Sequence, residues 1–144
     1  LKDCRISGHT TNGLTVYGGA KPTLESCEIS RNTGPDVVIW GEGDPQLSKC
    51  QIVSGKSVGV WVRAGGRGTL SACEISRSKV AGLQVDGGTP VLNGCTLKKL
   101  PVAARYSGNG GGQLTHCILS DNAEDIVVID GPGPRIRPVE AAEE

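Results

Sequence analysis

The sequence predicts an all-β fold, a right-handed parallel β-helix solenoid of about six coils with 22–23 residues in each. Three observations predict it. The cysteines recur at a nearly constant interval, apolar residues alternate along a second short segment of every repeat, and Gly and Pro fill the turns between these segments. Such short segments leave no room for helices, so each coil is expected to add one strand to each of two or three parallel sheets.

The cysteine interval is the clearest of these signs. The intervals are 23, 23, 23, 22 and 22 residues, between Cys4, Cys27, Cys50, Cys73, Cys95 and Cys117. A leucine stands three positions before each cysteine and an aliphatic residue two positions after it, as Leu24 and Ile29 do around Cys27. Because one coil cannot bury the apolar residues of this motif alone, columns of stacked aliphatic side chains are expected to stabilise the fold.

A second apolar pair at alternate positions follows in each coil. The pairs are Leu14 and Val16, Val37 and Ile39, Val60 and Val62, Leu83 and Val85, Ala104 and Tyr106, and Val127 and Ile129. Since side chains alternate between the two faces of a strand, this spacing predicts a strand whose paired residues point into the core.

A leucine-rich repeat is the alternative fold, because its period of about 20 to 29 residues overlaps this one. That repeat needs Leu-x-x-Leu-x-Leu followed by a helical or 3₁₀ return. Here the return has a second apolar alternation and Gly- and Pro-rich turns, such as residues 18–22 and 41–45. The pattern therefore favours the β-helix.

The repeat occupies residues 1–131, which we assign to one β-helix domain. Residues 132–144 are rich in Pro and Glu, and we expect them to form a tail or a cap over the C-terminal end of the sheets. The chain contains no Met, and Leu1 already stands inside the repeat. We therefore expect it to be a segment of a longer protein.

Charge and hydropathy argue against two classes of partner. Lys plus Arg and Asp plus Glu both total 15, so no net field gathers nucleic acid or an anionic membrane around the chain. No stretch approaches the roughly 20 consecutive apolar residues that cross a bilayer. We expect no nucleic-acid partner and no membrane span.

The six cysteines are expected to be free thiols. Residues stacked in a parallel ladder point the same way, whereas a disulfide needs two side chains turned toward each other. Thiols in such a column pack as small apolar groups. Free thiols indicate a reducing compartment, so the sequence predicts a cytoplasmic protein.

Two stretches of the chain carry a family resemblance. They are residues 65–75 (Gly-Gly-Arg-Gly-Thr-Leu-x-x-Cys-Glu-Ile) and residues 81–95 (Ala-Gly-Leu-x-Val-x-Gly-Gly-Thr-Pro-Val-Leu-x-x-Cys). They resemble repeats of the pectate-lyase-like superfamily, especially the carbohydrate-binding and sugar-hydrolase type found in bacterial multidomain proteins and certain F-box proteins. The resemblance covers about residues 1–131. It implies the β-helix fold, and either recognition of a protein partner or binding or cleavage of polysaccharide.

The outer face of the second strand holds the candidate binding residues. Two columns are expected to face solvent: Thr15, Val38, Trp61, Gln84, Arg105 and Val128 in one, and Tyr17, Trp40, Arg63, Asp86, Ser107 and Asp130 in the other. Tyr17, Trp40 and Trp61 fall in adjacent coils, where they are predicted to form an exposed aromatic patch with Val38. A flanking domain or a second copy could equally cover these rings.

The sequence offers no clear catalytic set. Asp86 and Asp130 share a column but lie two coils apart, about 10 Å on the stacking rule, which exceeds the spacing of a glycosidase pair. Asp36 and Asp44 are expected in turns, too scattered for a calcium site. We expect no catalytic residues, no metal ligands and no cofactor.

The predicted function is a non-catalytic recognition or scaffolding module. It would bind a protein partner or another copy of itself through the exposed aromatic face or the coil ends. The predicted binding residues are Tyr17, Trp40, Trp61, Arg63, Asp86 and Arg105. The alternative is a carbohydrate-binding or polysaccharide-degrading β-helix fragment, in which sugar stacks on the same rings and Asp86 is the functional acid.

Overall fold

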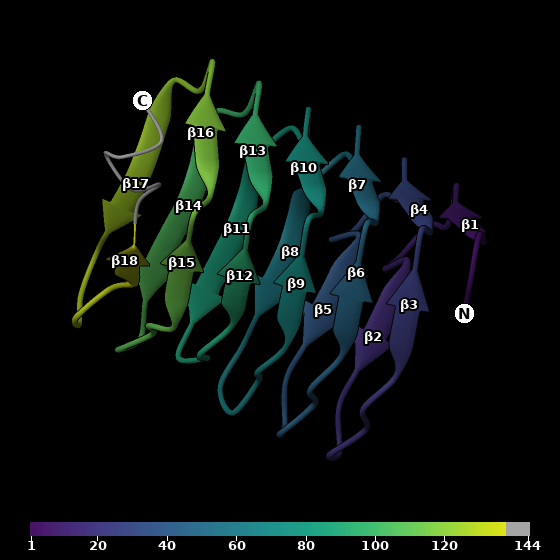
Figure 1. The fold of residues 1–144 in the computed structure, drawn as a ribbon, viewed down its shortest axis with the longest axis horizontal. Helices are drawn as coiled ribbons and strands as arrows, with labels where there is room; N and C mark the ends of the chain where they lie inside the picture. The colour runs from purple at the N-terminus through teal and green to yellow at the C-terminus, as the bar shows by residue number, and fades with distance from the viewer. Residues whose placement is uncertain (138–144) are drawn as a thin grey trace.

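The computed structural model describes residues 1–137 and contains eighteen strands, with no helix among those residues. The strands form three parallel sheets of six strands each, and every coil contributes one strand to each sheet. We number the coils by their cysteines, so that coil 1 holds Cys4 and coil 6 holds Cys117. Figure 1 shows the coils lying side by side along the rod. The predicted β-helix is confirmed, and the number of sheets, predicted as two or three, is three.

Each sheet takes every third strand of the chain. Sheet B contains β1 (Arg5–Ser7), β4 (Glu28–Ser30), β7 (Gln51–Val53), β10 (Glu74–Ser76), β13 (Thr96–Lys98) and β16 (Ile118–Ser120). Sheet C contains β2 (Leu14–Val16), β5 (Val37–Ile39), β8 (Val58–Val62), β11 (Ala81–Asp86), β14 (Val102–Ser107) and β17 (Glu124–Val128). Sheet A contains β3 (Thr23–Glu25), β6 (Gln46–Ser48), β9 (Thr69–Ser71), β12 (Val91–Asn93), β15 (Gln113–Thr115) and β18 (Arg135–Arg137).

The register stacks like residues on like. Ile29 pairs with Ile6 and Ile52, and Leu47 pairs with Leu24 and Leu70. These aliphatic side chains of coils 2 to 4 are 0–2% exposed. At about 1.5–3 kcal/mol for each fully buried aliphatic side chain, the columns supply the main favourable free energy of folding.

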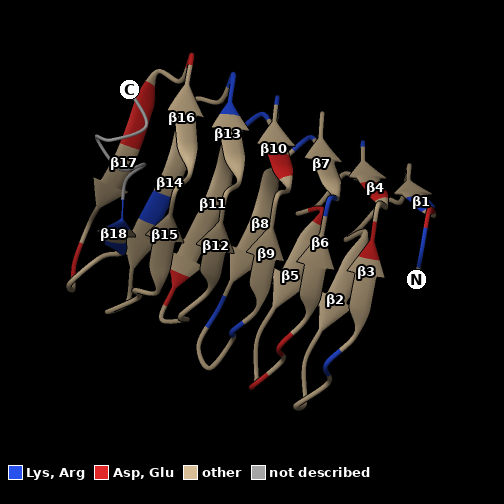
Figure 2. Cartoon of the chain, in the orientation of Figure 1, with Lys and Arg blue, Asp and Glu red and all other residues tan. Residues whose placement is uncertain are grey.

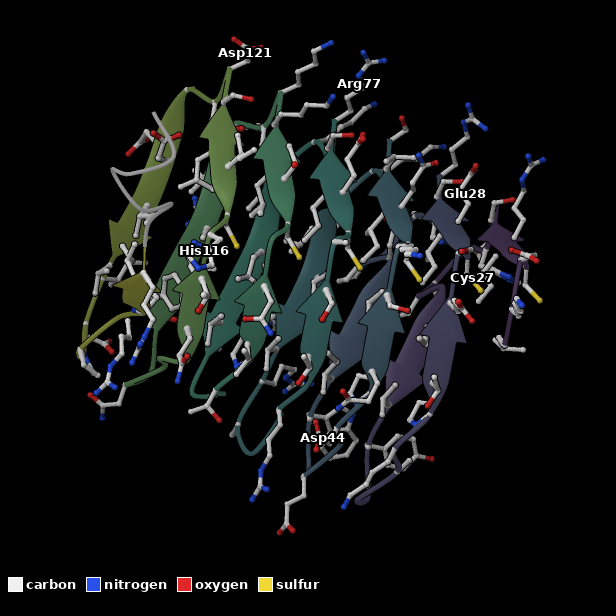
Figure 3. All side chains as sticks on the ribbon, in the orientation of Figure 1. Cys27, Glu28, Asp44, Arg77, His116 and Asp121 are labelled. Atoms are coloured by element: carbon white, nitrogen blue, oxygen red, sulfur yellow. The ribbon has the colours of Figure 1, made fainter. Side chains whose placement is uncertain are left out.

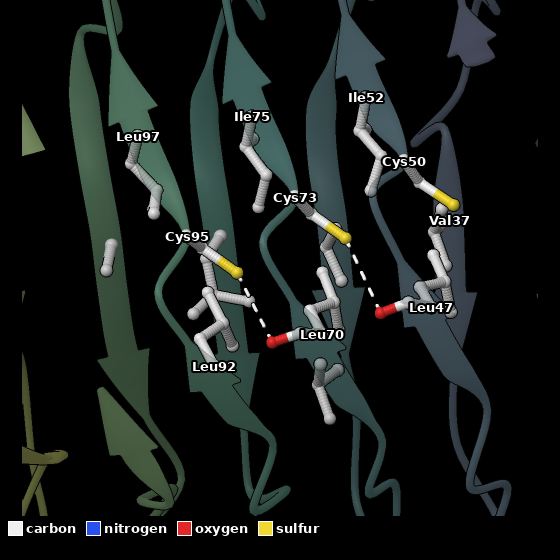
Figure 4. Close-up of a cluster of buried hydrophobic side chains, with 14 of the residues drawn as sticks. Val37, Leu47, Cys50, Ile52, Leu70, Cys73, Ile75, Leu92, Cys95 and Leu97 are labelled. Carbon is white, nitrogen blue, oxygen red and sulfur yellow. Dashed lines mark hydrogen bonds between the residues drawn. The ribbon is translucent and has the colours of Figure 1, made fainter. Parts of the chain in front are cut away.

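The cysteines form one column of free thiols between sheets A and B. Four of them, Cys27, Cys50, Cys73 and Cys95, are buried, and the two at the ends are partly exposed. The Cys73 thiol donates to the carbonyl oxygen of Leu47 in the coil before it, at 3.5 Å, and Cys95 does the same to Leu70 at 3.3 Å (Figure 4). The stacked, buried cysteines confirm the predicted ladder.

The alternation of inward and outward residues breaks near the start of two of the longer strands of sheet C, β8 and β11. A side chain at Gly59 or Gly82 would point at the core, because an added Cβ would lie 3.0 or 3.2 Å from the Cγ2 of Ile75. The residues just before these glycines, Val58 and Ala81, belong instead to a second apolar cluster. This cluster, against which Trp61 packs, forms a small second apolar layer on sheet C.

The register of the last coil corrects two predicted positions. Val127 pairs with Arg105 and Val128 with Tyr106, so the inward pair is Ile126 and Val128, not Val127 and Ile129. The paired residues of coils 5 and 6 are 22 positions apart, like the last two cysteines, Cys95 and Cys117. The predicted pair instead assumed an interval of 23 residues, from Tyr106 to Ile129. Ile129 is accordingly 64% exposed.

The segment assigned to a C-terminal tail begins with further ladder structure. Strand β18 pairs in parallel with β15, and Ile136 lies opposite Leu114. The part of the predicted tail or cap from 138 to 144 lies outside the described residues.

Candidate binding face on sheet C

The ladder of sheet C places the predicted binding residues in two adjacent columns. Trp61 pairs with Val38 and Gln84, and Gln84 pairs with Arg105. The neighbouring column runs through Tyr17, Trp40, Arg63, Asp86 and Ser107. Because strands stack about 4.8 Å apart, residues of adjacent coils are within side-chain reach of one another.

Tyr17 and Trp40 form an exposed aromatic stack. Their ring centroids lie 5.1 Å apart at an interplanar angle of 13°. The residues are 56% and 41% exposed, and each follows directly on a strand of sheet C; the Trp40 N–H donates to Val16 O of the preceding coil at 3.0 Å. Such a pair contributes about 0.5–1.5 kcal/mol beyond its buried area. The stack is therefore a fixed apolar surface in contact with solvent.

Trp61 is less exposed than the sequence predicted. It is half-buried and packs against the outer apolar cluster of Val58, Ala81 and Val102. The guanidinium of Arg63 lies 4.9 Å from its ring centroid, which is a cation–π contact. The sequence did not identify this cluster, although an apolar residue directly before Gly59 and Gly82 was a visible sign of it.

Val38 does not join the exposed patch. It is only 4% exposed, which makes the predicted four-residue aromatic and aliphatic patch wrong at this position. The ladder places it between Thr15 and Trp61, and the large Trp61 side chain of the next coil is within reach to cover it.

Asp86 connects three coils. Its Oδ2 accepts hydrogen bonds from Trp61 Nε1 at 2.6 Å and from Gln84 Nε2 at 3.1 Å, and its Oδ1 accepts one from the Ser107 hydroxyl. Burial acts to raise the pKa of Asp86, but the hydrogen bonds from Ser107, Gln84 and Trp61 and the charge of Arg63 outweigh it. The pKa is held below its ordinary value, so Asp86 is a carboxylate at neutral pH.

Two other predicted site residues, Asp130 and Arg105, form no hydrogen bond or ion pair with Asp86. Asp130 lies past the end of β17, where its Oδ1 accepts the Asn109 backbone N–H at 2.9 Å, so it is a turn residue and does not share the column of Asp86. Arg105 is half-buried beside Gln84, and no hydrogen bond or ion pair joins it to Asp86 within residues 1–137. In the same part of the chain, no group of three or more His, Cys, Asp or Glu residues could hold a metal ion.

A buried acid lies away from this face. Asp36 lies in the bend just before β5, in agreement with its predicted turn position, but it is 0% exposed, and its Oδ1 accepts the Asn32 side-chain amide at 2.8 Å. Its Oδ2 has no hydrogen-bond partner and lies against Gly55. Burial raises the pKa of Asp36 to about 6, although the side-chain and backbone hydrogen bonds from Asn32 act against the rise. A Gly one coil further on was the only sign in the sequence of space for this side chain.

A family model matches nearly the whole chain. The family described as "Right handed beta helix region" matches residues 1–137. No curated protein matches the chain, and no solved structure matches it. None of the described residues forms a helix long and apolar enough to cross a membrane.

Proposed function

We propose that this chain, which belongs to the right-handed beta helix family, is a non-catalytic recognition module that binds a protein partner through the outer face of sheet C. The observation that carries the proposal is the exposed Tyr17–Trp40 stack, which adjoins the Trp61, Arg63 and Asp86 contacts. We define these five residues as the aromatic face. A second copy of the chain is the other protein that the face could bind.

The chemistry of the aromatic face supports a protein interface. Trp, Tyr and Arg are the residue types that contribute most to binding free energy at such interfaces. Here the Trp61 indole is fixed by its hydrogen bond to Asp86, and Tyr17 and Trp40 hold each other in place. Fixed side chains lose little conformational entropy when a partner binds, which improves affinity.

Two observations favour protein over polysaccharide. Sugar rings bind on open aromatic faces, whereas Tyr17 and Trp40 each use one face for the other ring. Cleavage of a glycosidic bond requires a pair of carboxyl groups, and Asp86 already accepts three side-chain hydrogen bonds as an ionised group. The hydrogen bonds of Asp86 suit it to orient the Trp61 side chain.

The cysteine ladder supports a proposal about location. The four inner thiols are buried, and all six are free. Such thiols persist in reducing compartments, so we place the protein in the cytoplasm.

Photo-crosslinking tests the proposed face. A benzoyl-phenylalanine in place of Trp40 is expected to give a discrete adduct, either with a protein of the source cell or with a second copy. The same group in place of Gln51, which is exposed on sheet B, is the matched control. Asp86→Ala is expected to weaken the adduct at position 40, because it removes the acceptor that holds Trp61.

Fluorescence distinguishes the alternatives. Tryptophan emission is expected to stay unchanged on titration with acidic oligosaccharides. A sugar-dependent emission shift without a protein adduct at position 40 would establish the carbohydrate alternative. An adduct equal in yield at positions 40 and 51 would remove the aromatic face as the binding surface.

A further inference from the structure

A row of basic side chains follows the corner where the chain passes from sheet B to sheet C. We define the basic corner as Arg31, Lys56, Arg77, Lys79 and Lys99, all of which are exposed. They belong to coils 2 to 5. Arg77 extends away from the sheets in Figure 3, and Figure 2 shows the basic positions along this edge above β10 and β13.

The backbone fixes the spacing of this row. Arg31, Arg77 and Lys99 occupy the same left-handed corner position, with φ values of 56°, 58° and 57°. Lys56 and Lys79 form a second column, since their N–H groups donate to the Asn32 and Gly55 carbonyls of the preceding coils, both at 3.2 Å. With about 4.8 Å between coils, the row extends about 14 Å along the rod.

The corner concentrates positive charge in a chain that is neutral overall. Its segments 30–35, 53–57, 76–80 and 98–101 contain no Asp or Glu. The ion pairs within residues 1–137 are Arg5 with Glu28 and Lys98 with Glu74, so no member of the basic corner is neutralised by a pair. The balancing charge at this edge lies in coil 6, where Asp121, Glu124 and Asp125 are exposed.

We propose that the basic corner binds an acidic segment of a partner polypeptide, extended along the rod axis. The charges are complementary, and an extended segment of about four or five residues matches the length of the row. The four aromatic residues of the chain, Tyr17, Trp40, Trp61 and Tyr106, all belong to the sheet C side of the coil. Single-stranded nucleic acid depends on such rings for base stacking, so the corner favours carboxylates. This surface is separate from the aromatic face.

Fluorescence anisotropy with a labelled ten-residue oligoglutamate peptide tests the proposal. Wild-type protein is expected to bind it at 50 mM salt, and the affinity is expected to fall about tenfold at 200 mM because exposed charges are screened. Lys56→Glu with Lys79→Glu is expected to weaken binding at least about tenfold. Lys21→Glu with Lys49→Glu, the same charge change at other exposed corners, is expected to change it less than about twofold.

The remaining outcomes are equally defined. Equal loss in the two double variants would mean that only net charge matters, and no binding at 50 mM salt would also overturn the proposal. Tighter binding of an oligothymidylate of equal charge would make nucleic acid the occupant instead.

Trp40→Ala is expected to leave peptide binding unchanged, so failure of the aromatic face and failure of the basic corner are separable. Sedimentation without peptide is expected to give a monomer; a dimer lost in Lys56→Glu with Lys79→Glu would make a second copy the occupant.

Discussion

The indole N–H of Trp61 donates a 2.6 Å hydrogen bond to the Asp86 carboxylate of the next coil. The same carboxylate accepts the Ser107 hydroxyl of the coil after that. One side chain thus joins coils 3, 4 and 5 on the outside of sheet C. This contact ties the aromatic face to the ladder, and it leads to the first prediction.

Asp86→Ala should free Trp61. The variant removes both carboxylate oxygens, so the indole N–H of Trp61 loses its acceptor. Because the site is partly solvated, we expect a loss of only about 1–2 kcal/mol in the free energy of unfolding. In a Trp40→Phe background, where Trp61 is the only Trp, its emission should shift to the red. Asp130→Ala is the control, and an unchanged spectrum in Asp86→Ala would contradict the orienting role.

The buried Asp36 should make stability depend on pH. Its pKa is about 6 in the folded protein and 3.8 for the ordinary group, so the folded state holds the proton more tightly. The stabilisation is therefore fully present below pH 3.8 and is lost as pH rises through 6. Relative to Asp36→Asn, the wild type should lose up to about 3 kcal/mol between pH 4 and 8. Urea unfolding across this range measures it, with Asp3→Asn as the exposed control.

Parallel pH curves for the wild type and Asp36→Asn would contradict the burial of an uncompensated carboxyl group. The pKa of Asp86 is also displaced from its ordinary value, but downward. Asp86 acts in the opposite direction, because its lowered pKa gives stability that is lost as pH falls. The comparison of two chains that differ only at position 36 isolates the buried group.

Gly55→Ala should lower the stability of the fold, because no space is left for a side chain at this position. An added Cβ would overlap the Asp36 Oδ2 atom, and that side chain is fully buried. We expect a loss of about 2–3 kcal/mol in the free energy of unfolding. Gly94→Ala is the contrasting variant: nothing lies within 4 Å of its added Cβ, but φ is +62°. It should lose only about 1 kcal/mol, from backbone strain. Equal losses would show that Asp36 does not occupy this space.

The thiol column should show two classes of reactivity. Cys4 and Cys117 are partly exposed, and a hydrogen bond with Cys95 holds the pKa of Cys117 below its ordinary value. Cys117 should therefore react with a maleimide fastest in the native protein at pH 7, because the thiolate is the nucleophile. Mass spectrometry should find the four inner thiols labelled only after unfolding. Rapid labelling of Cys50 or Cys73 in native protein would contradict the buried ladder.

The sequence predicted the parts of the fold that repeat. The Leu-x-x-Cys-x-Ile phrase predicts which side chains stack, because a parallel ladder places equivalent residues of successive coils opposite each other. Ile29, Leu47 and Cys73 lie where that rule places them. The rule gave the wrong inward pair in coil 6, where an interval of 22 or 23 residues changes which face each residue occupies.

The candidate site was predicted only in outline. Column positions brought Tyr17 beside Trp40, and Trp61 near Asp86, because backbone spacing alone decides these neighbours. The half-burial of Trp61 depends on its packing against the cluster of Val58, Ala81 and Val102, which residue alternation does not reveal. The burial of Asp36 was missed for a related reason: it depends on the absence of a side chain at Gly55, one coil away.

The uniform stacking of the coils also makes the rod a molecular ruler. Every coil advances the chain by about 4.8 Å, whatever its surface carries. A deletion or duplication of one whole repeat, such as residues 51–73, would keep each remaining side chain on its own face. It would change only how far apart along the axis the flanking features lie. The number of repeats therefore sets the distance between Tyr17 and the acidic edge of coil 6, independently of the residues that form either one.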